Sequence, residues 1–529
     1  MSIWLAADPP APQGVSSETW ADALRAERLR IDISLAEMGL KDPSKLPEWC
    51  REYQDLVSKV GWSMVLEANR ALRDWEPRRK ELLSLLRHRL SSGDDRSWKR
   101  VTGTLLHHVR KQFPVGQGGF HAGVVGASVT GFPYHPTFPG GALSLFYVYD
   151  CGSIPRRFVD REIDRLLDAA RGRTLDLLYL SHFDCDHICG TPRLLDSKIG
   201  LKVDTIVMPF VDDAERLVAY GRSAQRRYAP ATRTFFDDMI VDPTEALERF
   251  GPRQIIYVFG DGEAPPELAD VGPSDPPRGG EMWKIEGSQG SAPEAWRSPG
   301  NRGVVVRNAT IAVSSGGVRG GWRLIPFVQR ADRARVEAFA RAAEVLLGWE
   351  RGSFEPMVRE KAVRRELVTK NRVVLGRAYK YAFGDKNITS LCLYSGPDDP
   401  EGAGVVQLWP KLSPADRAKV AWLATGDANL ADPDVISDFE RHYRGVLDYV
   451  STFMLPHHGS IHNSDPTNLI SDADIWVAAA EPRNPEWEHP ADELVQAVLR
   501  RGAIFEHVRS ALSTSLIERM LIYWPHTET

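Results

Sequence analysis

Residues 181–187 read Ser181-His182-Phe183-Asp184-Cys185-Asp186-His187. Four side chains that can bind a metal, at positions 182, 184, 186 and 187, therefore fall within six residues. In an extended turn alternate side chains point the same way, so His182, Asp184 and Asp186 can converge while His187 reaches a second ion nearby. Neutral imidazole and carboxylate groups suit Zn²⁺, Mn²⁺ or Fe²⁺. The pattern predicts a site for one or two divalent metal ions.

The segments around this cluster predict an α/β fold. An apolar strand over 175–180 runs straight into the cluster, after a strand over 143–149 and a helix over 160–170. Polar clusters at the C-terminal ends of strands are where α/β folds place their sites. Further elements are predicted as strands over 203–208, 388–394, 405–409, 420–424, 450–455 and 475–479, and helices over 433–443 and 492–500.

The cluster resembles the signature of the metallo-β-lactamase superfamily, His-x-His-x-Asp-His, with Asp184 in place of the second histidine. The resemblance implies an αββα sandwich, with an N-terminal helical region and a large insertion in this chain. An aspartate at this position makes the site harder and richer in oxygen. That change favours Mn²⁺ without excluding Zn²⁺.

Other motifs are similar to the hydrolase domain of ComEC-type DNA-internalisation competence proteins. They cover roughly 112–210 and 385–525, in the expected order. One departure is Gly119, where that branch usually has an aspartate. The motifs are Val115-Gly116-Gln117-Gly118, Tyr149-Asp150-Cys151-Gly152-Ser153, Asn387-Ile388-Thr389-Ser390-Leu391, Thr425-Gly426-Asp427, His457-His458-Gly459-Ser460 and His489-Pro490.

The resemblance implies roles for these residues. Asp427 matches the metal-bridging aspartate, and Asp186 would hold an ion and orient the attacking hydroxide. Of the adjacent pair, we expect His457 to bind metal and His458 to meet the substrate, although the sequence leaves open which one is the ligand. His489 is expected to bind metal or to protonate the leaving group.

One histidine of the superfamily is missing, because no histidine lies between His187 and His442. Two readings stay open. Asp212 and Asp213 can stand in for the missing ligand, or the first metal position is weak or empty.

Chemically, a divalent ion brings the pKa of bound water from about 15.7 to near 7, and the hydroxide attacks a phosphorus or carbonyl centre. The ComEC-like resemblance implies a phosphodiesterase or nuclease acting on nucleic acid or a nucleotide. Residues 359–380 carry eight Lys or Arg against two Glu, a net of +6 that can guide a phosphate backbone. The alternatives are a hydrolase of an ester, lactam or thioester, and a binding or effector subunit controlled by a partner.

The chain has 529 residues, a net charge of −5 and five cysteines. It shows no long apolar run and no signal-peptide pattern, so we predict a cytoplasmic protein that does not span a membrane. The global charge gives no support for a protein that coats nucleic acid. Residues 1–110 are predicted as a helical accessory region and 111–529 as the metallo-β-lactamase-fold domain, with 211–384 a partly helical insertion. A protein partner can bind through the N-terminal region or the insertion, and the oligomeric state is left open.

Overall fold

The computed structural model describes residues 15–37, scattered positions between 52 and 64, and 105–523 with gaps. The gaps lie at 129–143, 171, 225, 227, 261–267, 270, 281–282, 288–291, 299–302, 314–320, 385–388, 399–403, 410–418 and 482–488. The chain divides into two compact units, one of Met1–Thr102 with Leu512–Ser515 and one of Gly103–Ala511 with Leu516–Thr529. In the first unit, helix α1 (Ser17–Glu37) contributes Trp20, Ala23 and Leu24 to a small apolar cluster. Residues 65–104 of the predicted N-terminal helical region lie outside the described residues.

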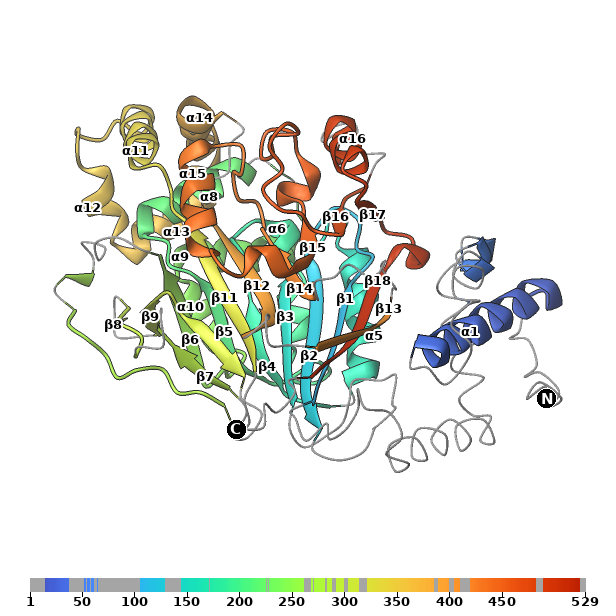
Figure 1. Ribbon diagram of the computed structural model, residues 1–529. Coiled ribbons are helices and arrows are strands. Elements are labelled where there is room, and N and C mark those ends of the chain that lie inside the picture. Colours follow the sequence, from blue (N-terminus) through green and yellow to red (C-terminus); the bar gives the residue numbers. More distant parts are fainter. Residues whose placement is uncertain are drawn as a thin grey trace, which may run out of the picture. The chain divides into compact units, whose positions relative to one another are not determined.

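A ten-stranded mixed sheet forms one half of the second unit (Figure 1). Its middle strands, from β3 to β6 and on to β9, are parallel, and the flanking pairs are antiparallel. In spatial order the strands are β13 (Gly404–Trp409), β18 (Leu516–Tyr523), β1 (Leu105–Gln112), β2 (Phe120–Ser128), β3 (Ser144–Cys151), β4 (Leu175–Tyr179), β5 (Val203–Pro209), β6 (Gln254–Phe259), β9 (Val304–Arg307) and β8 (Ala295–Arg297).

An eight-stranded mixed sheet forms the other half. Strands β14 to β17 are parallel, and the remaining pairs are antiparallel. In spatial order the strands are β17 (Ile504–Val508), β16 (Ile475–Ala479), β15 (Val450–Met454), β14 (Ala421–Ala424), β12 (Ser390–Pro397), β11 (Trp322–Gln329), β10 (Thr310–Val313) and β7 (Trp283–Glu286).

Alternation along the strands divides the core into layers. In β3, Leu145, Tyr147 and Tyr149 face the apolar core between the two sheets, while Phe146 and Val148 face the helices on the outer side. Burial on both faces explains why this strand is a continuous apolar run. The result is a helix–sheet–sheet–helix stack.

The ten-stranded sheet is covered by α5 and by α8 to α14, and the eight-stranded sheet by α15 and α16. Helices α8, α11 and α14 pack on one another (Figure 1). The helices are α5 (Arg157–Ala170), α6 (Cys185–Ile188), α7 (Thr191–Leu194), α8 (Asp213–Ser223), α9 (Pro230–Val241), α10 (Pro243–Glu248), α11 (Arg333–Leu347), α12 (Phe354–Val358), α13 (Lys361–Lys370), α14 (Arg372–Phe383), α15 (Pro433–His442) and α16 (Asp492–Arg500). Short 3-10 turns lie at Leu447–Tyr449, Pro456–Gly459 and Leu512–Thr514.

Two expectations need correction. The helical region was expected to run to residue 110, but 105–110 belong to β1, where Leu106, His108 and Arg110 are buried at alternate positions. The expected insertion, 211–384, does supply helices α8 to α14. It also supplies strands β6 to β11, which are divided between both sheets, so this region is part of the sandwich rather than an addition to it. Those strands escaped prediction because several are only three or four residues long.

Among the described helices, none is both long and apolar enough to cross a bilayer. Cysteines 151, 185, 189 and 392 are buried and free of disulfides. Cys185 and Cys189 pack in the core beneath the helices.

Candidate metal centre

The predicted cluster lies where four strands end. Strand β4 leads into His182 and α6, and β3 ends beside Asp150. In the opposite sheet, β14 leads to Asp427 and β15 to the turn that carries His457 and His458. Pairs β3–β4 and β14–β15 are parallel, so within each pair the C-terminal ends lie side by side. Side chains that are spread over residues 150–458 of the sequence are thereby brought together.

Two overlapping groups of buried side chains can each hold an ion. One consists of His182, His187 and Asp427, and the other of Asp186, His187 and His458. In each group the ligand atoms lie within 4.8 Å of one another. A buried carboxylate needs a compensating positive charge, which a bound cation could supply here.

The hydrogen bonds of two histidines show which ring nitrogen carries the proton. His187 Nδ1 lies 2.7 Å from Asp150 Oδ2, and His458 Nδ1 lies 2.8 Å from the carbonyl oxygen of Ala479. Both partners only accept, so each Nδ1 donates. In the neutral imidazole, which is the form that binds a metal, each Nε2 then keeps its lone pair. A ligand histidine that donates its other N–H to a carboxylate or carbonyl is the usual arrangement in metal sites.

The proton position of His182 is set in a similar way, by the hydroxyl of Ser181. The Ser181 hydroxyl donates to Asp150 Oδ2 at 2.7 Å, so its oxygen is free to accept from His182 Nδ1 at 2.9 Å. Again the Nε2 lone pair is left pointing into the cluster.

Each of these three lone pairs faces a carboxylate. Nε2 of His182 and of His187 lies 3.4 Å from Asp427, and Nε2 of His458 lies 3.3 Å from Asp186. Within the described residues, none of the three Nε2 atoms has a hydrogen-bond partner. Lone pairs facing anionic oxygens repel unless a proton or a metal ion lies between them, so these residues fit a divalent metal ion.

The pKa values agree with a site that attracts positive charge. Burial lowers the pKa of His187, but Asp150 and Asp427 more than offset it and raise that pKa well above its ordinary value. Burial likewise raises the pKa of Asp427, but His457, His182 and His187 hold it well below its usual range.

Asp184 and His457 lie in the same cluster but have another partner. The guanidinium of Arg222, on α8, lies 2.5 Å from Asp184 Oδ2 and 2.7 Å from His457 Nε2. Asp184 is therefore buried beside a fixed cation. The structure groups His458, rather than His457, with side chains that can hold a metal.

A strained turn separates the two adjacent histidines. His457 and His458 both have left-handed backbones, with φ of 48° and 59°. Non-glycine residues rarely adopt this conformation, and functional sites are where it is tolerated. The turn sends His457 toward Asn463 and His458 toward Ala479, so neighbouring residues serve different parts of the site.

His489 lies beside His457, with ring centroids 5.2 Å apart. The backbone close to His489 is held by a hydrogen bond, in which the N–H of Ala491 donates to the carbonyl oxygen of Gly459. Burial lowers the pKa of His489 to about 4, so the free protein carries it as a neutral imidazole at pH 7. That state does not favour His489 as the acid before substrate binds.

The suggested stand-ins for the missing histidine have structural roles. Asp212 caps α8 by accepting from the backbone N–H of Glu215, and it pairs with Arg333. Asp213 pairs with Arg216 and Arg364. Neither aspartate is in the two ligand groups.

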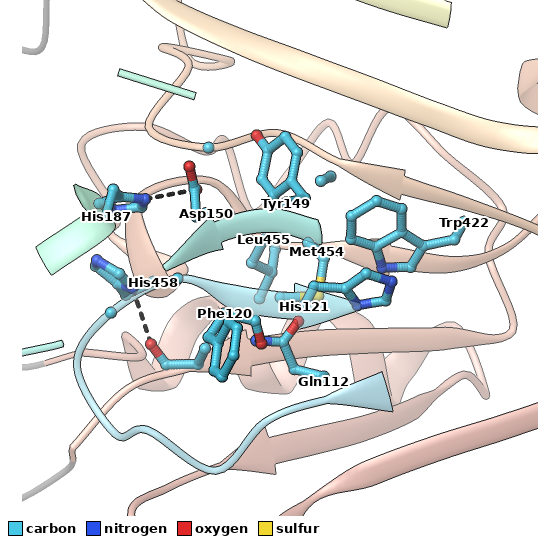
Figure 2. Close-up of a pocket in the computed structure, with 15 residues that line it drawn as sticks. Gln112, Phe120, His121, Tyr149, Asp150, His187, Trp422, Met454, Leu455 and His458 are labelled. Carbon is cyan, nitrogen blue, oxygen red and sulfur yellow. Dashed lines mark hydrogen bonds and ion pairs between the residues drawn. The ribbon is translucent and has the colours of Figure 1, made fainter. Parts of the chain in front are cut away.

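A small cavity is lined in part by His187 and His458 (Figure 2). Its volume of about 40 Å³ is enough for a water molecule. His187, His458 and Asp150 line it together with His121, which stacks on Trp422 with centroids 3.8 Å apart. Burial holds the pKa of His121 well below its ordinary value, so this histidine is a neutral packing residue.

Sequence reasoning missed two residues of the site. Asp150 was recognised as part of a motif but received no role, although it orients both Ser181 and His187. Gly119 makes this possible, because a Cβ there would lie 2.8 Å from Asp150 and 2.9 Å from His187 Nδ1. No local sequence pattern identifies Arg222 as a site residue, because its partners are distant in sequence.

Replacing Asp150 by asparagine is expected to weaken metal binding by about 10- to 100-fold, because His187 loses a charged acceptor that fixes its orientation. Competition with a chelating dye measures the affinity. Asp176→Asn is the matched control, since Asp176 accepts a backbone N–H from Phe146 away from the cluster. Equal metal affinity in the Asp150 variant and wild type would show that Asp150 does not support the ligand.

No family model matches this chain, and no curated protein matches it.

Proposed function

We propose that this chain is a metal-dependent hydrolase of the metallo-β-lactamase fold that cleaves phosphodiester bonds in nucleic acid or a nucleotide. The observation that carries the proposal is the convergence of three Nε2 lone pairs on buried carboxylates. The order of the motifs and the helix–sheet–sheet–helix layering support the choice of fold.

In this proposal Asp186, His187 and His458 are the ligands of a divalent ion, and Asp427 and His182 complete its surroundings. A bound ion supplies a Lewis acid that lowers the pKa of water toward neutrality and offsets negative charge that develops on the substrate. The protein's contribution is to hold the ligands still. Asp150 orients His187, and the carbonyl of Ala479 orients His458. The mixed nitrogen and oxygen donors suit Zn²⁺ or Mn²⁺.

Exposed positive charges on a helix that packs against α8 favour an anionic substrate. Helix α14 packs on α8, and it exposes Arg372, Arg377 and Lys380. Other members of the basic run are engaged: Lys361 pairs with Asp242, Arg365 with Asp238, and the buried Arg364 with Asp213. The C-terminal part of the run, on α14, is therefore the part best placed to meet phosphate groups.

A turnover screen tests the proposal. Purified protein with Mn²⁺ or Zn²⁺ is offered single-stranded DNA, duplex DNA, RNA, cyclic nucleotides, and ester and lactam substrates. We expect cleavage of at least one phosphodiester substrate that stops when the metal is chelated. Cleavage of esters or lactams alone would move the chain to the second class of hydrolase. Bound metal without turnover on any substrate would favour a partner-controlled subunit.

Removing residues 1–100 is expected to leave metal content and turnover unchanged, because every proposed ligand lies in the unit that begins at Gly103. Elemental analysis and the same turnover assay on the purified truncation measure both. A soluble truncation that binds no metal would show that the N-terminal unit is needed to assemble the site.

A further inference from the structure

Arg222 lies inside the candidate metal centre. Its Nη1 is 2.5 Å from Asp184 Oδ2 and 3.3 Å from Asp427 Oδ2, and its Nη2 is 2.7 Å from His457 Nε2. Only 14% of the Arg222 side chain is exposed. Two carboxylates and an imidazole nitrogen are the kind of donors that bind a divalent ion, and here they surround a guanidinium.

The proton positions show that Arg222 donates to His457. Asn463 Nδ2 donates to the carbonyl oxygens of Asp427 and Ala428, which leaves Asn463 Oδ1 as an acceptor. His457 Nδ1 lies 2.8 Å from that oxygen and therefore carries the proton. The Nε2 lone pair of His457, which a metal would need, accepts from Arg222.

The backbone holds Arg222 in this place. Helix α8 begins with a capping box between Asp212 and Glu215, and Arg222 lies in its last turn. The preceding residue, Gly221, allows α14 to approach closely. A Cβ at Gly221 would lie 2.8 Å from the carbonyl oxygen of Leu375 and from Cβ of Tyr379. A packed helix, rather than a loop, therefore positions the guanidinium in the site.

The remaining donors suffice for one ion. Arg222 engages Asp184 and His457, which belong to neither ligand group, and it also contacts Asp427. The two groups together consist of five side chains: His182, Asp186, His187, Asp427 and His458. The two groups share His187, and one imidazole nitrogen binds a single ion. Unless Asp427 bridged them, two ions would leave one of them with fewer than the three protein ligands usual for a catalytic site, and Arg222 Nη1 already contacts Asp427 Oδ2 at 3.3 Å.

We propose that Arg222 replaces one of the two metal ions, so that the centre binds one divalent cation rather than two. The inference rests on the proposed metal-dependent function and specifies its stoichiometry. Arg222 supplies a permanent positive charge to Asp184 and Asp427 where a second ion would otherwise supply it. A guanidinium cannot be removed by a chelator, so this half of the site keeps its charge without metal.

The number of bound Mn²⁺ ions tests this proposal. The full-length protein is saturated with Mn²⁺, freed of excess by gel filtration, and analysed for manganese per chain and for spin coupling between ions. Arg222→Met removes the charge at similar length, and Arg222→Lys keeps it. Arg233→Met is the matched control, since the Arg233 side chain is also 14% exposed and pairs with Asp237 outside the cluster.

We expect one Mn²⁺ per chain in wild type, in Arg222→Lys and in Arg233→Met, and two with a spin-coupled signal in Arg222→Met. Two ions in wild type, or one ion in a folded Arg222→Met protein, would overturn the proposal. If Arg222→Met does not fold, the counts in wild type and Arg222→Lys decide. Two ions together with turnover would leave the proposed hydrolase intact. No binding of any divalent metal would overturn both.

Discussion

Asp186→Asn is expected to lower turnover by roughly a hundred- to a thousandfold, the order found when one preorganised polar group is removed from an active site. Asp186 is 7% exposed, and its carboxylate faces His458 Nε2 at 3.3 Å. Asparagine keeps the volume and removes the negative charge, so the ion loses a ligand while the packing is preserved. Steady-state rates, metal content and circular dichroism are measured on the same preparation.

Asp237→Asn provides the comparison, because Asp237 is 8% exposed and lies on α9, outside both ligand groups. We expect it to retain turnover within a few-fold of wild type. A folded Asp186→Asn protein with wild-type activity would remove Asp186 from the proposed ligands. A similar loss in both variants would point to a general effect of burying an amide.

Glu518→Gln is expected to destabilise the fold by about 3–5 kcal/mol, because it leaves a buried guanidinium without its counter-charge. Arg110 and Glu518 are 1% and 2% exposed, and two hydrogen bonds of 2.6 Å join them. Arg110 also donates to Ser451 and Thr452 on β15, so this network ties the ten-stranded sheet to the eight-stranded one. The shift of the urea unfolding midpoint measures the loss.

Asp164→Asn breaks an exposed ion pair, Arg193–Asp164 at 2.6 Å, and should cost less than about 1 kcal/mol. Replacing both buried partners, with Arg110→Met and Glu518→Leu, should recover much of the stability lost by Glu518→Gln. If Glu518→Gln costs no more than Asp164→Asn, the buried pair does not hold the sheets together.

Much of the fold followed from local pattern. The strand over 475–479 and the helix over 492–500 match β16 and α16, because each has a periodicity that its own residues carry. Strand β1 was missed because its alternation includes buried polar side chains, His108 and Arg110, whose partners lie elsewhere. The partner of Arg110, Glu518, is 408 residues away, so no short stretch of sequence contains both.

The residues of the candidate site also divide into those that a local pattern identifies and those that depend on distant contacts. His182, Asp184, Asp186 and His187 were recognisable because one short segment contains them all. The distinction between His457 and His458 depends on a left-handed turn and on Asn463 and Ala479, which no spacing rule supplies. Arg222 depends on how α8 packs, so only tertiary structure reveals it.

The pairing of β1 with β18 also bears on how the protein is made. Arg110 and Glu518 are 408 residues apart, so at synthesis rates of about 5–20 residues per second Arg110 waits roughly 20 to 80 s for its partner. During that interval β1 has one open edge, which is a template for pairing with another chain. Ribosome stalling or premature termination before β18 would therefore release chains prone to aggregate, and a chaperone that covers β1 during translation would raise the yield of folded protein.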